Sequence, residues 1–306
     1  MHTFLVALLP VMMIIITGFV LKQLNLPGSD AWRGVERITY FVLFPSLLVS
    51  TLAQRKLHGL PWQEMLQIIA LVLILASVVL IAWYKLFSNS SGSTFTSIFQ
   101  GGVRFNTYIT LSVAYSLYGE QGLMLASVVA GFMIVIVNVL CVLAFAIWGG
   151  SARSGVRAFF KEVVTNPLIV ACVVGLFLSS SGIGLNRYLG DALQMLGRAA
   201  LPLGLLTVGA ALNLRALRYH AMPIVISSLV QFGLKPLAIY LAFMQFGLNG
   251  VAAAVIFIAF TTPTSPSSFI LARQLGGDAE TMVSIITFQT LIAFAMMPLL
   301  AEIFLF

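Results

Sequence analysis

Apolar segments long enough to cross a lipid bilayer follow one another along nearly the whole chain, and this pattern restricts the possible folds more than any other feature. A helix needs about 20 residues to span the hydrocarbon core. Only 8% of the residues are charged, whereas soluble domains carry about 25%. We therefore expect an all-α polytopic membrane protein with ten transmembrane helices, at roughly residues 3–22, 33–53, 62–84, 94–118, 121–148, 163–182, 190–213, 220–245, 249–275 and 279–304.

Lysine and arginine are distributed unevenly between the connecting loops. The loops after the even-numbered segments and the adjoining helix ends, which lie on one side of the membrane, carry only Arg55, Lys56, Arg187 and Arg198. Because basic loops stay in the cytoplasm, we expect a multi-pass protein of the cell inner (plasma) membrane with both termini outside the cytoplasm. The basic residues behind the net charge of +7 then serve to orient the protein in the membrane, and no nucleic-acid partner is expected. The loops after the odd-numbered segments, with the adjoining helix ends, carry Lys22, Arg33, Arg37, Lys85, Arg153, Arg157, Lys161, Arg215, Arg218 and Arg273.

Helix-bending residues recur at one constant spacing. This spacing predicts two copies of a five-helix unit, residues 1–150 and residues 151–306. Since each unit crosses the membrane an odd number of times, the second copy would be inserted upside down, which is the inverted repeat of many transporters. The proline and glycine pairs that lie 157 positions apart are Pro10 with Pro167, Gly18 with Gly175, Pro45 with Pro202, and Gly119 with Gly276.

The ninth segment is interrupted by a polar stretch at its middle, from Thr261 to Phe269. Pro263 and Pro266 prevent a helix from running through unbroken. Backbone groups that lose their helical hydrogen bonds at membrane depth need partners from protein or from a water-filled cavity. Secondary transporters commonly build a substrate site from such helix breaks. A proline kink that only shapes the helix is the alternative. The hydroxyl residues beside the prolines that we assign to the site are Thr262, Thr264, Ser265 and Ser267.

The repeat predicts a second break in the fourth segment, because subtracting 157 from Pro263 leads to Asn106. No proline stands there, but two glycines weaken the helix. Arg104, Asn106 and Thr107 would be costly against lipid. Both breaks fall near the middle of their segments. Helices 4 and 9 are therefore expected to cross at the bilayer midplane, where half-helix N-termini present partial positive charge.

Two basic residues stand inside apolar segments, Arg104 at the predicted break and Lys235 in the eighth segment. The nine Asp and Glu residues all lie in loops or near segment ends. The missing counter-charge indicates an anionic substrate, a carboxylate that Arg104 can bind with two hydrogen bonds. Alternatively, Arg104 binds freed backbone carbonyls, and Lys235 reaches outward or binds helix ends. Asn138 and Gln289 either line the same site or join helices.

Several stretches resemble a known family over nearly the whole chain, namely RITYFVLFPSLLVSTLA, RFNTYITLSVAYSLYG, NPLIVACVVGLFLSSSGI, RAALPLGLLTVGAAL and PTSPSSFILARQLGGDAE. The most specific pieces are the Asn106–Thr107 pair, the two prolines of the ninth segment, and Ala272 to Gln274. By these residues the chain resembles the auxin efflux carrier family, which includes PIN-type carriers of plants and bacterial malate and malonate permeases.

The resemblance implies a substrate site at the crossing of helices 4 and 9, contacted by Asn106 and by Pro263 to Ser268. It also implies an elevator movement of a transport domain, segments 3–5 and 8–10, against a scaffold of segments 1, 2, 6 and 7 that forms a homodimer. The chain departs from plant members at Arg104 and Phe105, where those carry a neutral residue and a proline. These differences favour a small, doubly charged carboxylate such as malate or malonate.

Three functions follow from these features. The first is a secondary transporter of small organic anions, in particular dicarboxylates, working by elevator-type alternating access at the crossing of helices 4 and 9. The second is an exporter of auxin-like aromatic acids or other amphipathic metabolites, and the third is a membrane sensor that binds an anion without moving it. An enzyme, a metal site and a cofactor are not expected, because the histidines are scattered at segment ends and no nucleophile–base set shares one depth.

Overall fold

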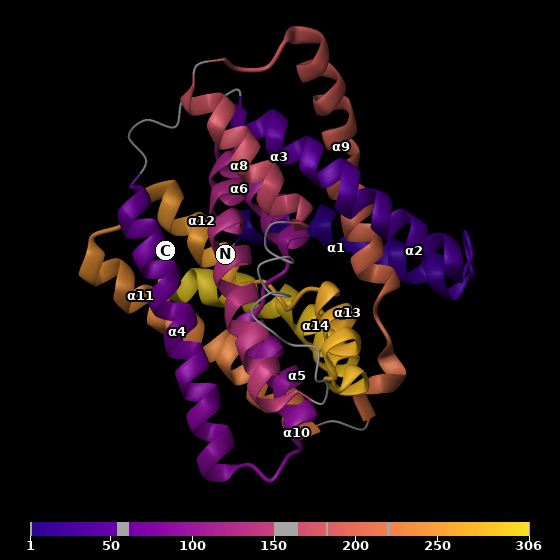
Figure 1. Cartoon of the computed structure of the whole chain (residues 1–306), viewed down its shortest axis with the longest axis vertical. Helices are drawn as coiled ribbons and strands as arrows, with labels where there is room; N and C mark the ends of the chain where they lie inside the picture. Colours follow the sequence, from indigo (N-terminus) through magenta and orange to yellow (C-terminus); the bar gives the residue numbers. More distant parts are fainter. Residues whose placement is uncertain (1, 54–60, 150–164, 182, 219–220, 306) are drawn as a thin grey trace.

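The computed structural model describes residues 2–53, 61–149, 165–181, 183–218 and 221–305. Within these ranges every regular element is a helix and no strand is present (Figure 1). The expectation of an all-α chain is therefore confirmed. The continuous apolar segments explain this result, since a backbone surrounded by lipid must satisfy its polar groups within its own helix.

The helices follow the expected segments closely. The first half contains α1 (His2–Gln23), α2 (Ser29–Ile38), the π-helical turn η1 (Thr39–Leu43), α3 (Phe44–Ala53), α4 (Trp62–Phe87), α5 (Gly92–Val103) and α6 (Thr107–Trp148). The second half contains α8 (Pro167–Ser180), α9 (Arg187–Ala210), the 3-10 turn η2 (Leu214–Arg218), α10 (Ala221–Leu229), the π-helical turn η3 (Val230–Leu234), α11 (Lys235–Phe246), α12 (Gly250–Thr261), α13 (Ser267–Leu275) and α14 (Ala279–Phe304).

Seven helical stretches in the described part of the chain are long and apolar enough to cross a membrane. One of them, Gly92–Trp148, has 57 residues and contains two of the expected segments. These two segments meet at Gly119, whose φ of 57° lies outside the helical region. Two shorter apolar helices, α8 and α12, lie within expected segments as well, so helix is present in all ten expected ranges.

Both interruptions lie where the sequence places them. The fourth segment leaves the helix after Val103 and resumes it at Thr107, and the ninth segment does so after Thr261 and at Ser267. In the ninth segment the two prolines account for the gap, because they lack a backbone donor and clash with the preceding turn. In the fourth segment Asn106 accounts for it by capping the new helix.

The helices pack in two groups. Helices α1, α3, α8 and α9 pack most extensively against one another, while α4, α5, α6, α10, α11, α12, α13 and α14 pack mainly among themselves. In the view of Figure 1, α3, α8 and α9 lie in the upper half, whereas α4 and α11 lie on the left and α5 and α10 lie at the bottom. The second group contains both broken segments, so the breaks are surrounded by protein.

Glycines bring α1 and α9 into backbone contact. A Cβ built on Gly209 would lie 1.9 Å from the carbonyl oxygen of Ile15, and one built on Gly18 would lie 2.1 Å from that of Leu206. No larger side chain fits either position without moving a backbone. Close approach through small residues is the usual way in which helices associate inside membranes.

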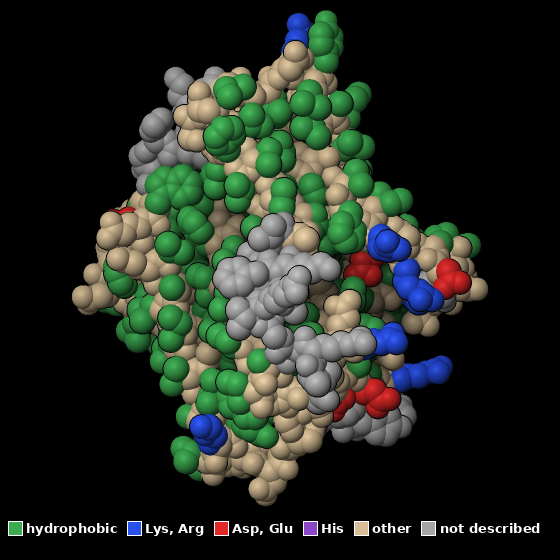
Figure 2. All heavy atoms as spheres, in the orientation of Figure 1, with side chains coloured by type: hydrophobic (Ala, Val, Ile, Leu, Met, Phe, Trp, Pro, Cys, Tyr) green, Lys and Arg blue, Asp and Glu red, His purple; other side chains and the backbone are tan. Residues whose placement is uncertain are grey.

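The surface separates apolar and charged side chains. Large hydrophobic residues are exposed along α1, α4, α8 and α11, where lipid rather than water would surround them. Figure 2 shows hydrophobic side chains over most of the visible face, whereas Lys and Arg gather mainly on the right, near the end of α2. This basic edge lies beside the cavities described below.

Candidate functional site

The two interrupted segments are joined directly at their breaks. The backbone N–H of Asn106 donates to Thr262 Oγ1 at 3.3 Å, and Thr264 Oγ1 donates to the carbonyl oxygen of Gln100 at 3.2 Å. Thr110 and Thr262 share a hydroxyl–hydroxyl bond of 3.3 Å. All five residues are fully buried. Thr262 therefore supplies a partner for a backbone N–H that the first break sets free, while Thr264 adds a second bond to a carbonyl that already accepts from the N–H of Arg104.

Asn106 starts the second half of the fourth segment. Its Oδ1 accepts from the backbone N–H groups of Tyr108 at 3.0 Å and Ile109 at 3.2 Å. The amide nitrogen Nδ2 is buried and has no hydrogen-bond partner among the described residues. A donor in this condition is costly unless a ligand or water occupies the space beside it.

Gln289 of α14 connects the two breaks from the side. Its Oε1 accepts from the backbone N–H of Thr264 at 3.0 Å, and its Nε2 donates to the carbonyl oxygen of Gly101 at 2.9 Å. The side chain is fully buried and lines none of the cavities described here. The sequence allows Gln289 either to line the site or to join helices, and its hydrogen bonds in the structure join helices.

Lys235 lies on the other side of the crossing and is fully buried. Its Nζ donates to Gln231 Oε1 at 2.6 Å and to the carbonyl oxygen of Arg104 at 3.5 Å. The ammonium also lies 5.5 Å from the centre of the Phe260 ring. Lys235 therefore binds a helix end and does not reach outward, which selects one of the two structural alternatives drawn from the sequence.

A cavity of about 810 Å³ lies next to the breaks, between the two helix groups. It narrows into a chamber of about 50 Å³. The residues that line both spaces are Tyr40, Arg104, Tyr108, Asn138, Asn166, Ser265 and Ser267. Arg104 is half-buried at this junction and donates to Gln100 Oε1 at 3.5 Å. Arg104 thus lines both the wide cavity and the narrow chamber.

The wide cavity carries an excess of positive charge. Arg33, Arg37 and Arg273 line it together with Arg104, and Glu36 is the single carboxylate among its lining residues. The sequence places Glu36 near the start of the second segment, and the structure adds that it lines the same cavity as Arg104. The basic charge at the break is therefore partly balanced, which sequence position alone does not reveal.

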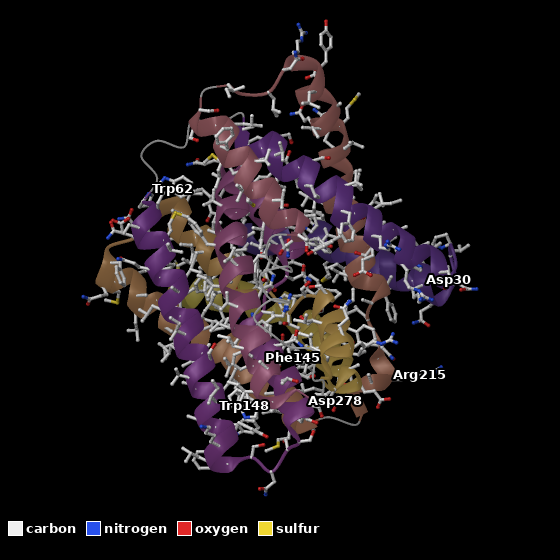
Figure 3. The ribbon with its side chains drawn as sticks, in the orientation of Figure 1. Asp30, Trp62, Phe145, Trp148, Arg215 and Asp278 are labelled. Carbon is white, nitrogen blue, oxygen red and sulfur yellow. The ribbon has the colours of Figure 1, made fainter. Side chains whose placement is uncertain are left out.

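A second cavity of about 870 Å³ adjoins the first and shares Arg33, Glu36 and Pro266 with it. It is lined by the end of α1 at Lys22 and by Arg215 after α9. Arg215 is labelled near the right-hand edge of Figure 3, and Asp278, which caps α14, lies at the lower centre. Both cavities thus lie beside the ends of helices whose following loops carry most of the basic residues.

The structure distributes the predicted site residues between the cavity and its support. Arg104, Thr107, Asn138, Ser265, Pro266 and Ser267 line the chamber or the wide cavity. Asn106, Thr262, Pro263, Thr264, Lys235 and Gln289 are buried around the breaks and line none of the cavities described here. The first set can touch a ligand as the cavity stands, whereas the second set lies around the crossing.

Among the cavity residues that sequence reasoning missed, Tyr40, Tyr108 and Asn166 line both the chamber and the wide cavity. Tyr108 stacks on Phe44 with ring centres 4.5 Å apart, so it joins the two helix groups at the cavity wall. Asn166 caps α8 through the N–H groups of the next helical turn. An Asn-Pro pair before an apolar run is a recognisable helix start, but the sequence does not indicate that this start faces the breaks.

Comparison with known proteins places the chain among transporters. Over 292 residues it is 22% identical to an uncharacterized transporter of Methanothermobacter thermautotrophicus, covering 95% of each chain. A 76-residue stretch is 41% identical to the ileal sodium/bile acid cotransporter of Cricetulus griseus, covering 25% of this chain and 22% of that protein. A stretch of equal length is 37% identical to the sodium-dependent organic anion transporter of Rattus norvegicus, covering 25% of this chain and 20% of that one.

The second half of the chain gives the family. Residues 151–301 match the family described as membrane transport protein. These residues include Lys235, the break between α12 and α13, and Gln289, which together form much of the crossing described above. The second half of the chain thus matches the membrane transport protein family, which is the auxin efflux carrier family, and this match supports a membrane transporter.

Proposed function

We propose that this transporter carries small organic anions, in particular dicarboxylates such as malate or malonate. The observation that carries the proposal is the position of Arg104, half-buried where the wide cavity narrows into the chamber between the breaks. A guanidinium binds a carboxylate through two parallel hydrogen bonds. An arginine held at membrane depth beside a cavity is a binding-site residue by default.

The helix ends at the chamber support binding of a negative charge. Helix α6 starts at Thr107 and α13 starts at Ser267, and both residues line the chamber. The N-terminus of a helix carries partial positive charge and unsatisfied N–H groups. Most of these N–H groups are already bonded by the residues that start each helix, so the two ends act on a carboxylate mainly through their partial charge. The hydroxyls of Ser265 and Ser267 supply donors beside them.

The dimensions of the chamber favour a substrate with two separated carboxylates. At about 10–15 Å³ per water position, a chamber of about 50 Å³ accepts a group the size of one carboxylate. A second carboxylate on a short chain would extend into the wide cavity, where Arg33, Arg37 and Arg273 add positive charge. The charge of both groups would then be met by arginine.

An inverted repeat of residues 1–150 and 151–306, with ten transmembrane helices, is the architecture that we propose. Helix α12 begins and ends 158 positions after α5. Gly119 and Gly276, which lie 157 positions apart, both have positive φ and both end a half-helix after a break. These correspondences support the repeat that the sequence predicts.

Transport by an elevator movement fits the packing of the helices. In this proposal α1, α2, α3, α8 and α9 form a scaffold through which two copies of the chain associate, and the remaining helices carry the site. The cavity lies between these groups, since Tyr40 and Asn166 come from one side and Arg104 and Ser265 from the other. The basic helix ends beside the cavities would face the cytoplasm, leaving both termini outside the inner membrane.

A larger, amphipathic organic acid is the second candidate, and the lining of the wide cavity favours it. Tyr40, Phe41, Tyr108 and Phe269 contribute aromatic surface to a volume of about 810 Å³, which exceeds the needs of a small dicarboxylate. Two of the mammalian relatives are transporters of bile acid and of organic anions by name. Competition between substrates separates the two candidates.

The test is uptake of labelled malate, malonate and succinate into proteoliposomes, with unlabelled indole-3-acetate as an aromatic competitor. Saturable uptake that Arg104→Ala reduces at least tenfold is expected, because a charge-assisted hydrogen bond contributes about 1.5–3 kcal/mol, or roughly 10-fold to 150-fold in affinity. Arg104→Lys should retain part of the uptake. Arg187→Ala is the matched control, since Arg187 is exposed and lines none of the cavities described here. Full uptake by Arg104→Ala would refute the assigned role of Arg104.

A further inference from the structure

The crossing of the broken helices has opposite polarity on its two sides. The N-terminal ends of α6 and α13 lie at the chamber, as described above. The C-terminal ends of α5 and α12 lie beside Lys235 and Gln231, which are one helical turn apart at the junction of η3 and α11. The C-terminus of a helix carries partial negative charge and unsatisfied carbonyl groups.

Lys235 and Gln231 together bind both of these negative ends. Lys235 Nζ donates to the carbonyl oxygen of Arg104 just after α5, while Gln231 Nε2 donates to the carbonyl oxygens of Phe260, at 3.1 Å, and Thr262 at the end of α12. Gln231 Oε1 accepts from Lys235 Nζ at 2.6 Å. The ammonium, the amide and three backbone carbonyls thus form one connected network.

The charge of Lys235 is compensated by dipoles rather than by an acid. Lys235 and Gln231 have no exposed surface, and no Asp or Glu in the described part of the chain pairs with Lys235. A buried charge without a counter-ion persists only where hydrogen bonds and dipoles stabilise it. Here the two helix C-termini and the face of the Phe260 ring provide that stabilisation.

In inverted-repeat transporters, half-helix C-terminal ends and freed backbone carbonyls are the groups that coordinate a coupling cation. We propose that Lys235 is a built-in counter-cation of the crossing, in the position that a bound metal cation would otherwise occupy, so that this chain moves its anion without sodium. The proposal rests on the proposed function as an anion carrier. Its direct consequence is that each transported anion moves without a compensating cation, so transport follows the membrane potential.

The first measurement is thermal unfolding of the detergent-purified protein, and it does not depend on the substrate. Samples contain sodium chloride, choline chloride or n-propylammonium chloride at one ionic strength. The wild type should unfold at the same temperature in all three salts. Lys235→Ala should unfold at a lower temperature in choline, and sodium or n-propylammonium should restore part of the loss by filling the vacated position. Lys235→Arg, which keeps the charge, and Lys85→Ala, which removes an exposed lysine, should resemble the wild type.

The second measurement is anion uptake into proteoliposomes with sodium replaced by choline. Wild-type uptake should be unchanged, whereas Lys235→Ala should lose at least tenfold and recover part of the activity in sodium or n-propylammonium. Three results would overturn the proposal: a wild type that needs sodium, a Lys235→Ala variant that matches the wild type in choline, or a damaged variant that neither cation improves. Wild-type uptake in sodium and in choline can be compared without any variant. This comparison therefore still tests sodium independence if Lys235→Ala folds poorly.

The two measurements also separate this proposal from the proposed function. If the wild type transports none of the tested anions, the proposed substrate class is wrong. Cation-dependent unfolding of Lys235→Ala, together with salt-independent unfolding of the wild type, would still support the role of Lys235.

Discussion

Replacing Gln289 with methionine tests how the crossing is held together. Methionine has a similar length and volume, so the packing cost of the exchange should stay below about 1.5 kcal/mol. The exchange removes both hydrogen bonds of the side chain, those to the N–H of Thr264 and the carbonyl of Gly101. Both backbone groups belong to the breaks, where no intact helix is available to replace the lost partner.

The expected loss follows from the desolvation of these two groups. A buried donor or acceptor left without a partner costs about 1–3 kcal/mol. Two such groups give about 2–6 kcal/mol, a large share of the stability of an ordinary protein domain. Gln289→Met should therefore lower the free energy of unfolding in mixed detergent and denaturant micelles by an amount in this range.

The neighbouring Thr290 supplies the matched control. It is fully buried, and its hydroxyl has no hydrogen-bond partner among the described residues. Thr290→Val removes an unsatisfied polar group and should leave the stability unchanged or raise it slightly. Equal stability of Gln289→Met and the wild type, or an equal loss in Thr290→Val, would show that the bonds of Gln289 do not hold the breaks together.

Two further predictions concern the helix contact and the helix cap. Gly209→Ala should destabilise the protein by about 1–3 kcal/mol, because the added methyl group meets the carbonyl of Ile15, whereas Gly34→Ala, which adds a methyl group in open space, should be neutral in the same unfolding assay. Asn106→Asp retains the oxygen that caps α6 but loses the unpaired Nδ2 donor, so it should keep near-normal thermal stability and weaken substrate binding at least tenfold in a direct binding assay. Normal binding by this variant would remove Asn106 from the site.

The sequence was sufficient to locate both breaks for physical reasons. Proline interrupts a helix wherever it stands, so Pro263 and Pro266 mark the ninth segment directly. The break at Asn106 has no such marker, and its prediction depends on the constant spacing of 157 residues together with two weakening glycines and the polar residues beside them. The described helices end and begin at both positions.

The pairing of side chains across the crossing was beyond sequence reasoning. Lys235 gives an ambiguous signal, because a polar residue in an apolar segment can face a ligand, a helix end or the membrane surface. Arg33, Arg37 and Arg273 were assigned to membrane orientation, since charge in a short loop normally reports that alone. Only the folded chain shows that these three also line the wide cavity.

The partners of the first break are all synthesised late. Gly101 is bonded by Gln289, the N–H of Asn106 by Thr262, and the carbonyl of Arg104 by Lys235, each at least 131 residues further along the chain. At about 5–20 residues per second, the ribosome delivers them roughly 7–40 seconds after the first break enters the membrane. Without proline, the fourth segment can remain one continuous helix during this interval and open when its partners arrive. The ninth segment finds Gln100, Asn106, Thr110 and Gln231 already in place, and its remaining partner Gln289 follows 25 residues later, so permanent breakers are tolerated there.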